Sequence, residues 1–183
     1  MNFFPLSPTG AYYIELDPKG DARGSFTRLL CMDELKKIGH IKQIVQVNHS
    51  YSQSKGTIRG LHFQYQPYEE IKLVICIRGK VFDVIVDLRS GSPTFLKWQS
   101  LELSMENRRM MYIPEGFAHG FQTLEDETEL LYFHTAYYAP DYEGGVLYND
   151  QKLGIAWPLA ASEISARDLK HKKIADDFKG IEL

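Results

Sequence analysis

Six histidines are the residues of this chain best suited to move protons at neutral pH, because imidazole titrates close to pH 7. They are His40, His49, His62, His119, His134 and His171. A metal site in a β-rich protein would need two or three of them to converge, and no HxH, HxxH or HExxH spacing occurs. Distant histidines can still meet in a fold, but this spacing favours proton transfer over metal binding.

His62 lies in the segment Gly60-Leu-His-Phe-Gln64. In a strand, Gln64 would share its face, while Leu61 and Phe63 would point to the opposite one. One interpretation is a core histidine whose ring nitrogens are satisfied by neighbouring groups, and the residues alone favour it. The other is a general base at the mouth of a barrel.

Tyr132 and His134 occupy one face of segment 130–135, with Leu131 and Phe133 on the other. This alternation suggests a polar cavity, although an exposed tyrosine-rich face of a sheet would show the same pattern.

Asp168 follows Ser165 at the spacing of a capping box. Taken alone, this spacing predicts a helix cap rather than a catalytic carboxylate.

Arg23 and Arg59 each precede a glycine, which leaves steric room for an anion to approach the guanidinium. Taken alone, each is better explained as an ordinary surface arginine in a turn. The net charge is −3 with a pI of about 6.1, so no broad positive field is available to hold nucleic acid or an anionic membrane. Any anionic ligand must therefore be bound by a few placed arginines and lysines.

The elements that position these residues are mostly strands. Segments 72–77 and 80–87 are apolar or strictly alternating and flank Arg78-Gly79, which predicts a hairpin of two long strands. Further strands are predicted over 98–103, 109–113, 120–124 and 129–138, and short helices over 32–38 and from residue 165. Short strands with frequent turns indicate an antiparallel sandwich or barrel with small helical additions.

The composition agrees with one β-rich domain. The 183 residues are 44% apolar, 25% charged and 13% aromatic, enough for one full core. Only Cys31 and Cys76 are present, so neither a disulfide framework nor a cysteine zinc site is expected. No apolar run approaches membrane-spanning length and no secretory signal is visible, so we expect a cytoplasmic protein.

Taken together, a series of motifs resembles the dTDP-4-dehydrorhamnose 3,5-epimerase family of nucleotide-sugar epimerases in the cupin superfamily. The motifs occur in family order between residues 21 and 168, so the resemblance covers most of the chain. They are Asp21-Ala-Arg-Gly-Ser-Phe26, Gln46-Val-Asn-His-Ser50, Ile58-Arg-Gly-Leu-His-Phe-Gln64, Lys72-Leu-Val74, segment 81–89, segment 92–95, Ile113-Pro-Glu-Gly-Phe-Ala-His-Gly-Phe121, Tyr132, Asn149-Asp150 and Gly154-Ile-Ala-Trp-Pro158.

The resemblance implies a mainly β cupin jelly-roll barrel or sandwich with short peripheral helices. It implies one domain over 1–183, with N-terminal strands and a short helix over 1–50, the barrel over 51–158 and a C-terminal helical segment over 159–183. It also implies a homodimer that exchanges its N-terminal strands, and a site inside the barrel that uses neither metal nor cofactor.

The resemblance further implies a catalytic role for each of four matching residues. His62 matches the catalytic base, and Asp168 matches the carboxylate paired with it. Tyr132 matches the acid on the opposite face of the sugar, and Lys72 matches the cation near the C4 oxygen. With the resemblance taken into account, the general-base interpretation of His62 is preferred over that of a core histidine.

The resemblance also implies a set of substrate-binding residues. Arg23 would be donated across the dimer and Arg59 would contact the diphosphate, with Phe26 as a stacking ring and with Asn48 and His119 along the site. A glutamine contact is expected at position 47. That position is Val47 in this chain, and the glutamine of the motif is its neighbour Gln46.

The resulting hypothesis is an epimerase that inverts C3 and C5 of a dTDP-4-keto-6-deoxyhexose, on the route to dTDP-L-rhamnose. Three alternatives stay open: inversion of C3 alone or use of another nucleotide sugar, a non-catalytic nucleotide-sugar-binding cupin, and a metal-dependent cupin oxygenase or isomerase.

Three departures from the pattern of many relatives occur, at four positions. Arg28 stands where a glutamate near the thymidine is common, and Leu147-Tyr148 replaces a common Arg-Trp. The third departure, Phe133 after Tyr132 in place of a common lysine, lies outside the proposed proton chemistry. The first two leave the nucleotide base and the exact sugar open.

Overall fold

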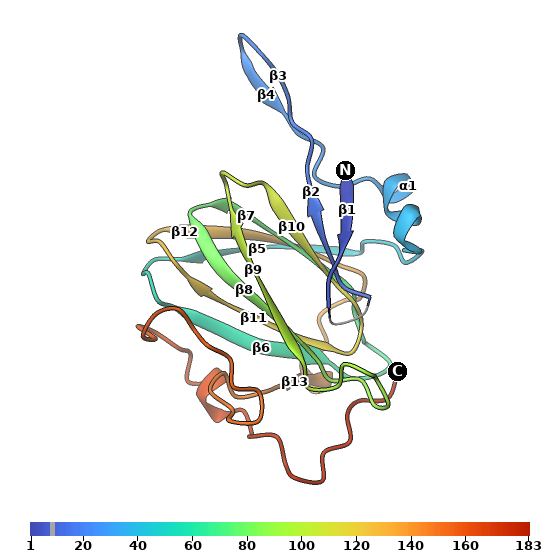
Figure 1. Ribbon diagram of the computed structural model, residues 1–183, viewed down its shortest axis with the longest axis vertical. Helices are drawn as coiled ribbons and strands as arrows, with labels where there is room; N and C mark the ends of the chain where they lie inside the picture. The colour runs from blue at the N-terminus through green and yellow to red at the C-terminus, as the bar shows by residue number, and fades with distance from the viewer. Residues whose placement is uncertain (8–9) are drawn as a thin grey trace.

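Two antiparallel β-sheets pack face to face in the computed structural model, which describes residues 1–7 and 10–183 (Figure 1). The predicted domain over 1–183 includes residues 8–9, which lie outside the described residues. The antiparallel two-layer architecture expected from the short alternating strands is confirmed. No helix in the described residues is both long and apolar enough to cross a membrane.

The first sheet has six strands, and every neighbouring pair in it is antiparallel. Their order is β1 (Asn2–Pro5), β2 (Tyr12–Glu15), β10 (Arg109–Ile113), β7 (Lys72–Arg78), β12 (Thr128–His134) and β5 (Gln46–Ser52). The second sheet has five antiparallel strands in the order β13 (Glu143–Gly145), β6 (Ile58–Gln64), β11 (Phe117–Thr123), β8 (Lys80–Asp87) and β9 (Trp98–Ser104).

The predicted hairpin of β7 and β8 is wrong, although both strands are present. β7 pairs with β10 and β12 in the first sheet, whereas β8 pairs with β9 and β11 in the second. The turn between them is a corner at which the chain crosses from one layer to the other. Gly79 takes a φ of +72° there, and a Cβ atom at this position would lie 2.6 Å from Oγ1 of Thr128, so the corner needs glycine.

Three apolar clusters explain why these strands are apolar on both sides. The inner faces of the two sheets meet through residues such as Val74, Val81 and Phe121. The outer face of the first sheet is covered by the segment around the short helix, including Leu30, Leu35 and Ile44. The outer face of the second sheet packs against the C-terminal segment, including Ile174. The central strands β6, β7 and β11, which carry part of the site, are therefore mostly buried, whereas the edge strand β5 is largely exposed.

Helical structure is limited to short turns. The predicted helix over 32–38 is present as α1 (Met32–Leu35) followed by the 3-10 turn η1 (Lys36–Ile38), and a second 3-10 turn, η2 (Pro140–Tyr142), precedes β13. Segment 159–183 is less helical than expected, because its one helical element is the 3-10 turn η3 (Asp168–Lys170). The segment instead runs as an extended strap along the second sheet (Figure 1) and forms a parallel bridge between Ile164 and Ile58.

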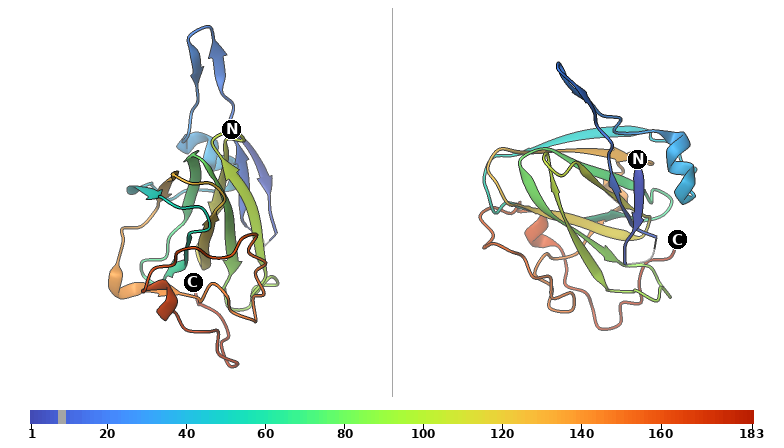
Figure 2. Two further views of the ribbon diagram at one scale, coloured as in Figure 1. Left: turned by 90° about the vertical axis from the view of Figure 1, so that its left-hand side faces the viewer. Right: turned by 45° about the horizontal axis from the view of Figure 1, so that its top comes forward.

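A two-stranded hairpin of β3 (Lys19–Asp21) and β4 (Gly24–Phe26) projects away from the two sheets. Figures 1 and 2 show it extending from the end of β2 without a neighbour in the chain. Phe26 at its base is 75% exposed. A projecting hairpin with an uncovered aromatic side chain is typical of an element that packs against another molecule.

Candidate active site

A cavity of about 1290 Å³ opens between the two sheets. Strands β5, β7 and β12 of the first sheet and β6 and β11 of the second contribute to its lining, and segment 162–168 closes one side. The volume is sufficient for a ligand larger than a single sugar. Of the ten predicted site positions, eight line this cavity: Val47, Asn48, Arg59, His62, Lys72, His119, Tyr132 and Asp168.

His62 and Asp168 form a hydrogen-bonded pair at one wall of the cavity. Nε2 of His62 lies 2.8 Å from Oδ1 of Asp168, whose side chain is 3% exposed. Burial alone would raise the pKa of Asp168, but hydrogen bonds from His62 and from the Gly60 amide outweigh it and lower the pKa to about 2. The carboxylate is thus ionised at neutral pH and accepts the proton on Nε2, which leaves Nδ1 as the unprotonated nitrogen of neutral His62.

Gly60 makes room for this pair. Its φ is +110°, and a Cβ atom there would lie 2.6 Å from the carbonyl oxygen of His119 on the neighbouring strand β11. The missing side chain therefore allows β6 to pack closely on β11, and the Gly60 amide donates to Oδ2 of Asp168 at 3.1 Å. The predicted capping interaction is only half present: Ser165 Oγ accepts from the Asp168 amide, while the Asp168 carboxylate is used by His62 and Gly60.

Tyr132 enters the cavity from β12, in the sheet opposite the one that carries His62. Its hydroxyl is 3.1 Å from Ser50 Oγ, and burial raises the pKa of Tyr132 far above neutrality. The hydroxyl is therefore a protonated donor at pH 7. The alternation that suggested a polar cavity around Tyr132 and His134 is confirmed.

His119 faces the same cavity from β11 in the second sheet. Its Nε2 lies 2.7 Å from Oδ1 of Asp83, and burial raises the pKa of that carboxyl. The ring of His119 lies edge-on to that of Tyr132, with 6.3 Å between the ring centroids. His119 therefore has a buried carboxylate partner of its own and does not compete with His62 for Asp168.

Lys72 places a positive charge in the same cavity. Its side chain is 10% exposed, with Nζ 3.1 Å from Oε1 of Glu70 and 3.4 Å from the carbonyl oxygen of His62. Sequence reasoning missed Glu70. Its position two residues before Lys72 was an available signal, because alternate residues of an extended chain point to the same side. Arg59 also lines the cavity and donates to the carbonyl of Tyr51 at 2.9 Å.

The glutamine contact expected at position 47 is wrong. The residue there is Val47, which is 55% exposed and lines the cavity with a side chain that has no hydrogen-bonding group. Gln46, the glutamine of the motif, is not part of the cavity lining and donates to Oδ1 of Asn48 at 3.2 Å. Gln46 therefore acts on the cavity through Asn48, and Val47 offers an apolar contact.

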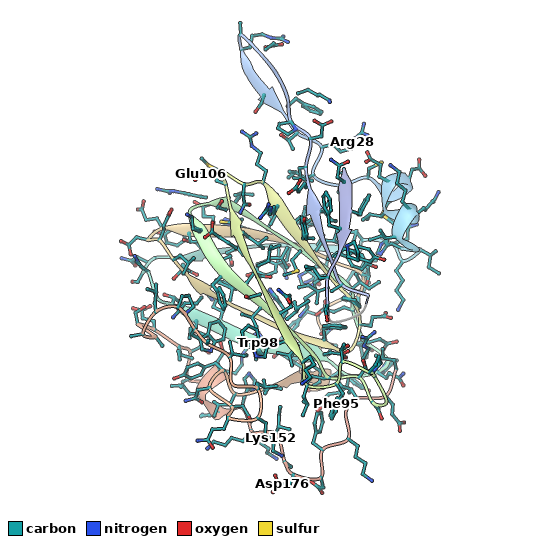
Figure 3. All side chains as sticks on the ribbon, in the orientation of Figure 1. Arg28, Phe95, Trp98, Glu106, Lys152 and Asp176 are labelled. Atoms are coloured by element: carbon teal, nitrogen blue, oxygen red, sulfur yellow. The ribbon has the colours of Figure 1, made fainter. Side chains whose placement is uncertain are left out.

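The other two predicted binding residues lie on the projecting hairpin, away from this cavity. The side chain of Arg23 is 90% exposed and paired with Asp21, and Phe26 stands on the same hairpin. Arg28 lies near the base of that hairpin (Figure 3) and forms an ion pair with Glu34. Within one chain the hairpin does not reach the site.

One group of side chains in the described part of the chain has the composition of a metal site. The ligand atoms of His62, Asp168 and His171 lie within 4.8 Å of one another. However, the Arg167 guanidinium lies 3.4 Å from Nε2 of His62 and 3.6 Å from Oδ1 of Asp168. A positive group at the donor atoms opposes a divalent cation, so the arrangement fits a proton between His62 and Asp168 better than a metal.

Comparison with known proteins identifies the family. Residues 6–176 match the family model of dTDP-4-dehydrorhamnose 3,5-epimerase. The chain belongs to this family. A curated dTDP-4-dehydrorhamnose 3,5-epimerase from Shigella flexneri is 44% identical over 163 residues, which cover 87% of this chain and 90% of the relative.

Solved structures agree with the assignment to the dTDP-4-dehydrorhamnose 3,5-epimerase family. The enzyme of that name from Bacillus anthracis, solved with TDP and PPi bound, is 41% identical with a TM-score of 0.92, over 94% of this chain and 99% of that one. A 3′-monoepimerase from Streptomyces bikiniensis, in complex with dTDP-quinovose, is 34% identical with a TM-score of 0.86, over 92% and 86% of the two chains. The predicted cupin-type fold and isomerase class are thereby confirmed.

Proposed function

We propose that this protein inverts C3 and C5 of a dTDP-4-keto-6-deoxyhexose, the epimerisation that leads to dTDP-L-rhamnose. The observation that carries the proposal is the placement of a histidine–carboxylate pair and a partly buried, protonated tyrosine on opposite sides of one cavity. Inversion of a carbon centre needs a base on one face of the sugar ring and an acid on the other. A ring held between the two sheets would meet one group on each face.

The chemistry follows from the C4 ketone, which acidifies the hydrogens on C3 and C5. Neutral His62 takes a proton from carbon through Nδ1, and ionised Asp168 stabilises the resulting imidazolium through Nε2. The electron pair of the broken C–H bond moves into an enolate whose charge lies on O4, where Lys72 provides a compensating positive charge. Tyr132 then returns a proton to the opposite face, and proton exchange with solvent restores neutral His62 and protonated Tyr132 before the second centre reacts, so the epimerisation involves no net oxidation.

The nucleotide part of the substrate needs further contacts. We assign Arg59 to the diphosphate, because its guanidinium lines the cavity and retains donors beyond those bonded to Tyr51 and Ser52. Asn48 and His119 would add polar contacts from the two sheets, and Val47 would add an apolar one.

The cytoplasmic location expected from the sequence stays a prediction. Cys31 and Cys76 are both free thiols in the structure. Free thiols are compatible with a reducing compartment, where disulfides are rare.

The proposed homodimer would supply Arg23 and Phe26 to the site of the partner. The hairpin that carries them projects from its own chain, and Arg23 is nearly fully exposed on it. In such an assembly each site would combine His62 of one protomer with Arg23 of the other. Phe26 would then offer an exposed ring for stacking on the nucleotide base.

Mixed dimers test this exchange. Arg23→Ala and His62→Asn are each expected to be inactive or strongly impaired as homodimers. When the two variants are refolded together at equal amounts, about one quarter of all sites would combine an intact Arg23 with an intact His62. Recovery of about one quarter of wild-type activity is the expected result, with the dimer measured by sedimentation. A monomer, or a dimer whose mixture stays inactive, would contradict the exchange.

The reaction itself is tested by isotope exchange. Incubation with dTDP-4-keto-6-deoxyglucose in heavy water is expected to place deuterium at both C3 and C5, as read by mass spectrometry and NMR, at a rate far above that without protein. The S. bikiniensis relative makes inversion of C3 alone the second candidate, and label at C3 only would establish it. Binding of the substrate without incorporation of label would overturn the proposed catalysis. Exchange with a UDP-sugar but not with the dTDP-sugar would show that the nucleotide base is uracil instead of thymine.

A further inference from the structure

A buried carboxylate connects two groups of the site that lie on different strands. Glu70 precedes β7, and its side chain is 8% exposed. Oε1 of Glu70 lies 3.1 Å from Nζ of Lys72, while Oε2 lies 2.6 Å from Nδ1 of His134. Nε2 of His134 is in turn 3.3 Å from the side-chain nitrogen of Asn48. All four side chains line the cavity.

We propose that Glu70 is a positioning residue of the site, which orients Lys72 directly and Asn48 through His134. The inference rests on the proposed function, in which Lys72 faces the C4 oxygen and Asn48 contacts the substrate. Neither Glu70 nor His134 touches the reacting atoms in that scheme. Their effect is to fix the orientation of Lys72 and of Asn48, the two side chains that would contact the ligand.

The first branch acts on Lys72. A lysine ammonium is a point charge with three N–H donors on a flexible stem. One donor is directed at Glu70 and a second at the carbonyl oxygen of His62. One contact comes from the residue two positions before β7 and the other from β6 in the opposite sheet, so together they hold the ammonium between β7 and β6. The third donor has no partner within residues 1–7 and 10–183 and is left for a ligand oxygen.

The second branch acts on Asn48 through the tautomer of His134. An ionised carboxylate only accepts hydrogen bonds, so Nδ1 of His134 must carry the proton in the contact with Glu70. Nε2 of the neutral ring is then an acceptor, and it takes a hydrogen bond from the Asn48 amide nitrogen. This leaves Oδ1 of Asn48 on the other side, where it accepts from Gln46. The orientation of the Asn48 amide thus depends on the charge of Glu70.

A carboxylate suits this position better than an amide of the same shape. Burial alone would raise the pKa of Glu70, but Lys72 and His134 outweigh it and lower the pKa, so the group is ionised at neutral pH. Glutamine could accept at one end only, and its NH2 group would face either the Lys72 ammonium or Nδ1–H of His134. If the glutamine NH2 group faced His134, the ring would have to carry its proton on Nε2 so that Nδ1 could accept. Two donors, Nε2–H and the NH2 group of Asn48, would then face each other.

The test compares two single variants with a matched control. Glu70→Gln is expected to lower kcat by about 10- to 100-fold, because a misplaced catalytic group costs this much without altering the fold. His134→Phe leaves the Glu70–Lys72 pair and is expected mainly to raise KM, by about fivefold, through the lost hydrogen bond to Asn48. Glu69→Gln carries the same change one residue away and should keep wild-type kcat and KM, since Glu69 does not line the cavity.

The double variant Glu70→Gln/Lys72→Met separates positioning from a merely structural role. If Glu70 acts through Lys72, the double variant has the kcat of Lys72→Met within about twofold. Additive losses in kcat, or a Glu70→Gln protein with wild-type kcat and KM, would overturn the inference. If Glu70→Gln does not fold, a His134→Phe protein with unchanged KM overturns the Asn48 branch. A wild-type protein that exchanges no deuterium would instead overturn the proposed function, which these variants do not address.

Discussion

The variant His62→Asn is expected to lose epimerase activity by about 1,000-fold in kcat/KM, within the range of about 10²–10⁴ for removal of a general base. Asparagine is too short to reach Oδ1 of Asp168, which loses the bond from Nε2, but the ionised carboxylate keeps the hydrogen bond from the Gly60 amide. Asparagine offers no nitrogen that takes a proton near pH 7. Deuterium exchange into the substrate and inversion should fall together, because the first step of both reactions is removal of the same proton.

His171 provides the matched control for His62. Its ring lies 5.4 Å from that of His62 between ring centroids, and its Nε2 is 3.7 Å from the same oxygen of Asp168. His171 does not line the cavity, so His171→Asn should keep exchange within a few-fold of wild type. Equal losses in both variants would mean that the electrostatics around Asp168, rather than a base at position 62, limit the reaction. Full activity of His62→Asn would remove His62 from the mechanism.

The fold illustrates which structural features are local in the sequence. β8 and β9 match their predicted limits within two residues, because side-chain alternation is a property of each strand alone. The pairing of β7 with β8 cannot be read in the same way. Two strands joined by a two-residue turn usually form a hairpin. The actual partners of β7 and β8 are strands later in the chain, and Gly79 at the crossing lies against Thr128, a residue 49 positions further along.

The site shows the same limit at the level of single side chains. The partner of His62 lies 106 positions away, and the residues alone favour a helix cap for Asp168, so only the resemblance to a family connects them. The contact between Glu70 and His134 illustrates what neither approach finds. Their contact depends on the register that places His134 opposite Lys72 across β12 and β7, and register is a property of the assembled sheet.

The variant Tyr132→Phe is expected to separate exchange from inversion. The substitution removes one hydroxyl and keeps the ring that packs against the inner core, so its main local cost is the lost hydrogen bond to Ser50. His62 can still remove a proton and return it to the same face, so deuterium should enter the substrate at a rate within about tenfold of wild type. Inverted product should fall by about 100-fold or more, since the acid on the opposite face is missing.

Tyr112→Phe is the matched control for this separation. Tyr112 is buried, and burial raises its pKa to about 12. Its hydroxyl makes one hydrogen bond, to His40. Unlike Tyr132, Tyr112 lies on the outer side of the first sheet. Its loss should leave both exchange and inversion unchanged. If Tyr132→Phe still inverted C3 and C5 at the wild-type rate, the second proton would have to come from another group or from water. If exchange and inversion fell equally, Tyr132 would instead be required to stabilise the enolate, and the assignment of acid and base to opposite sheets would need revision.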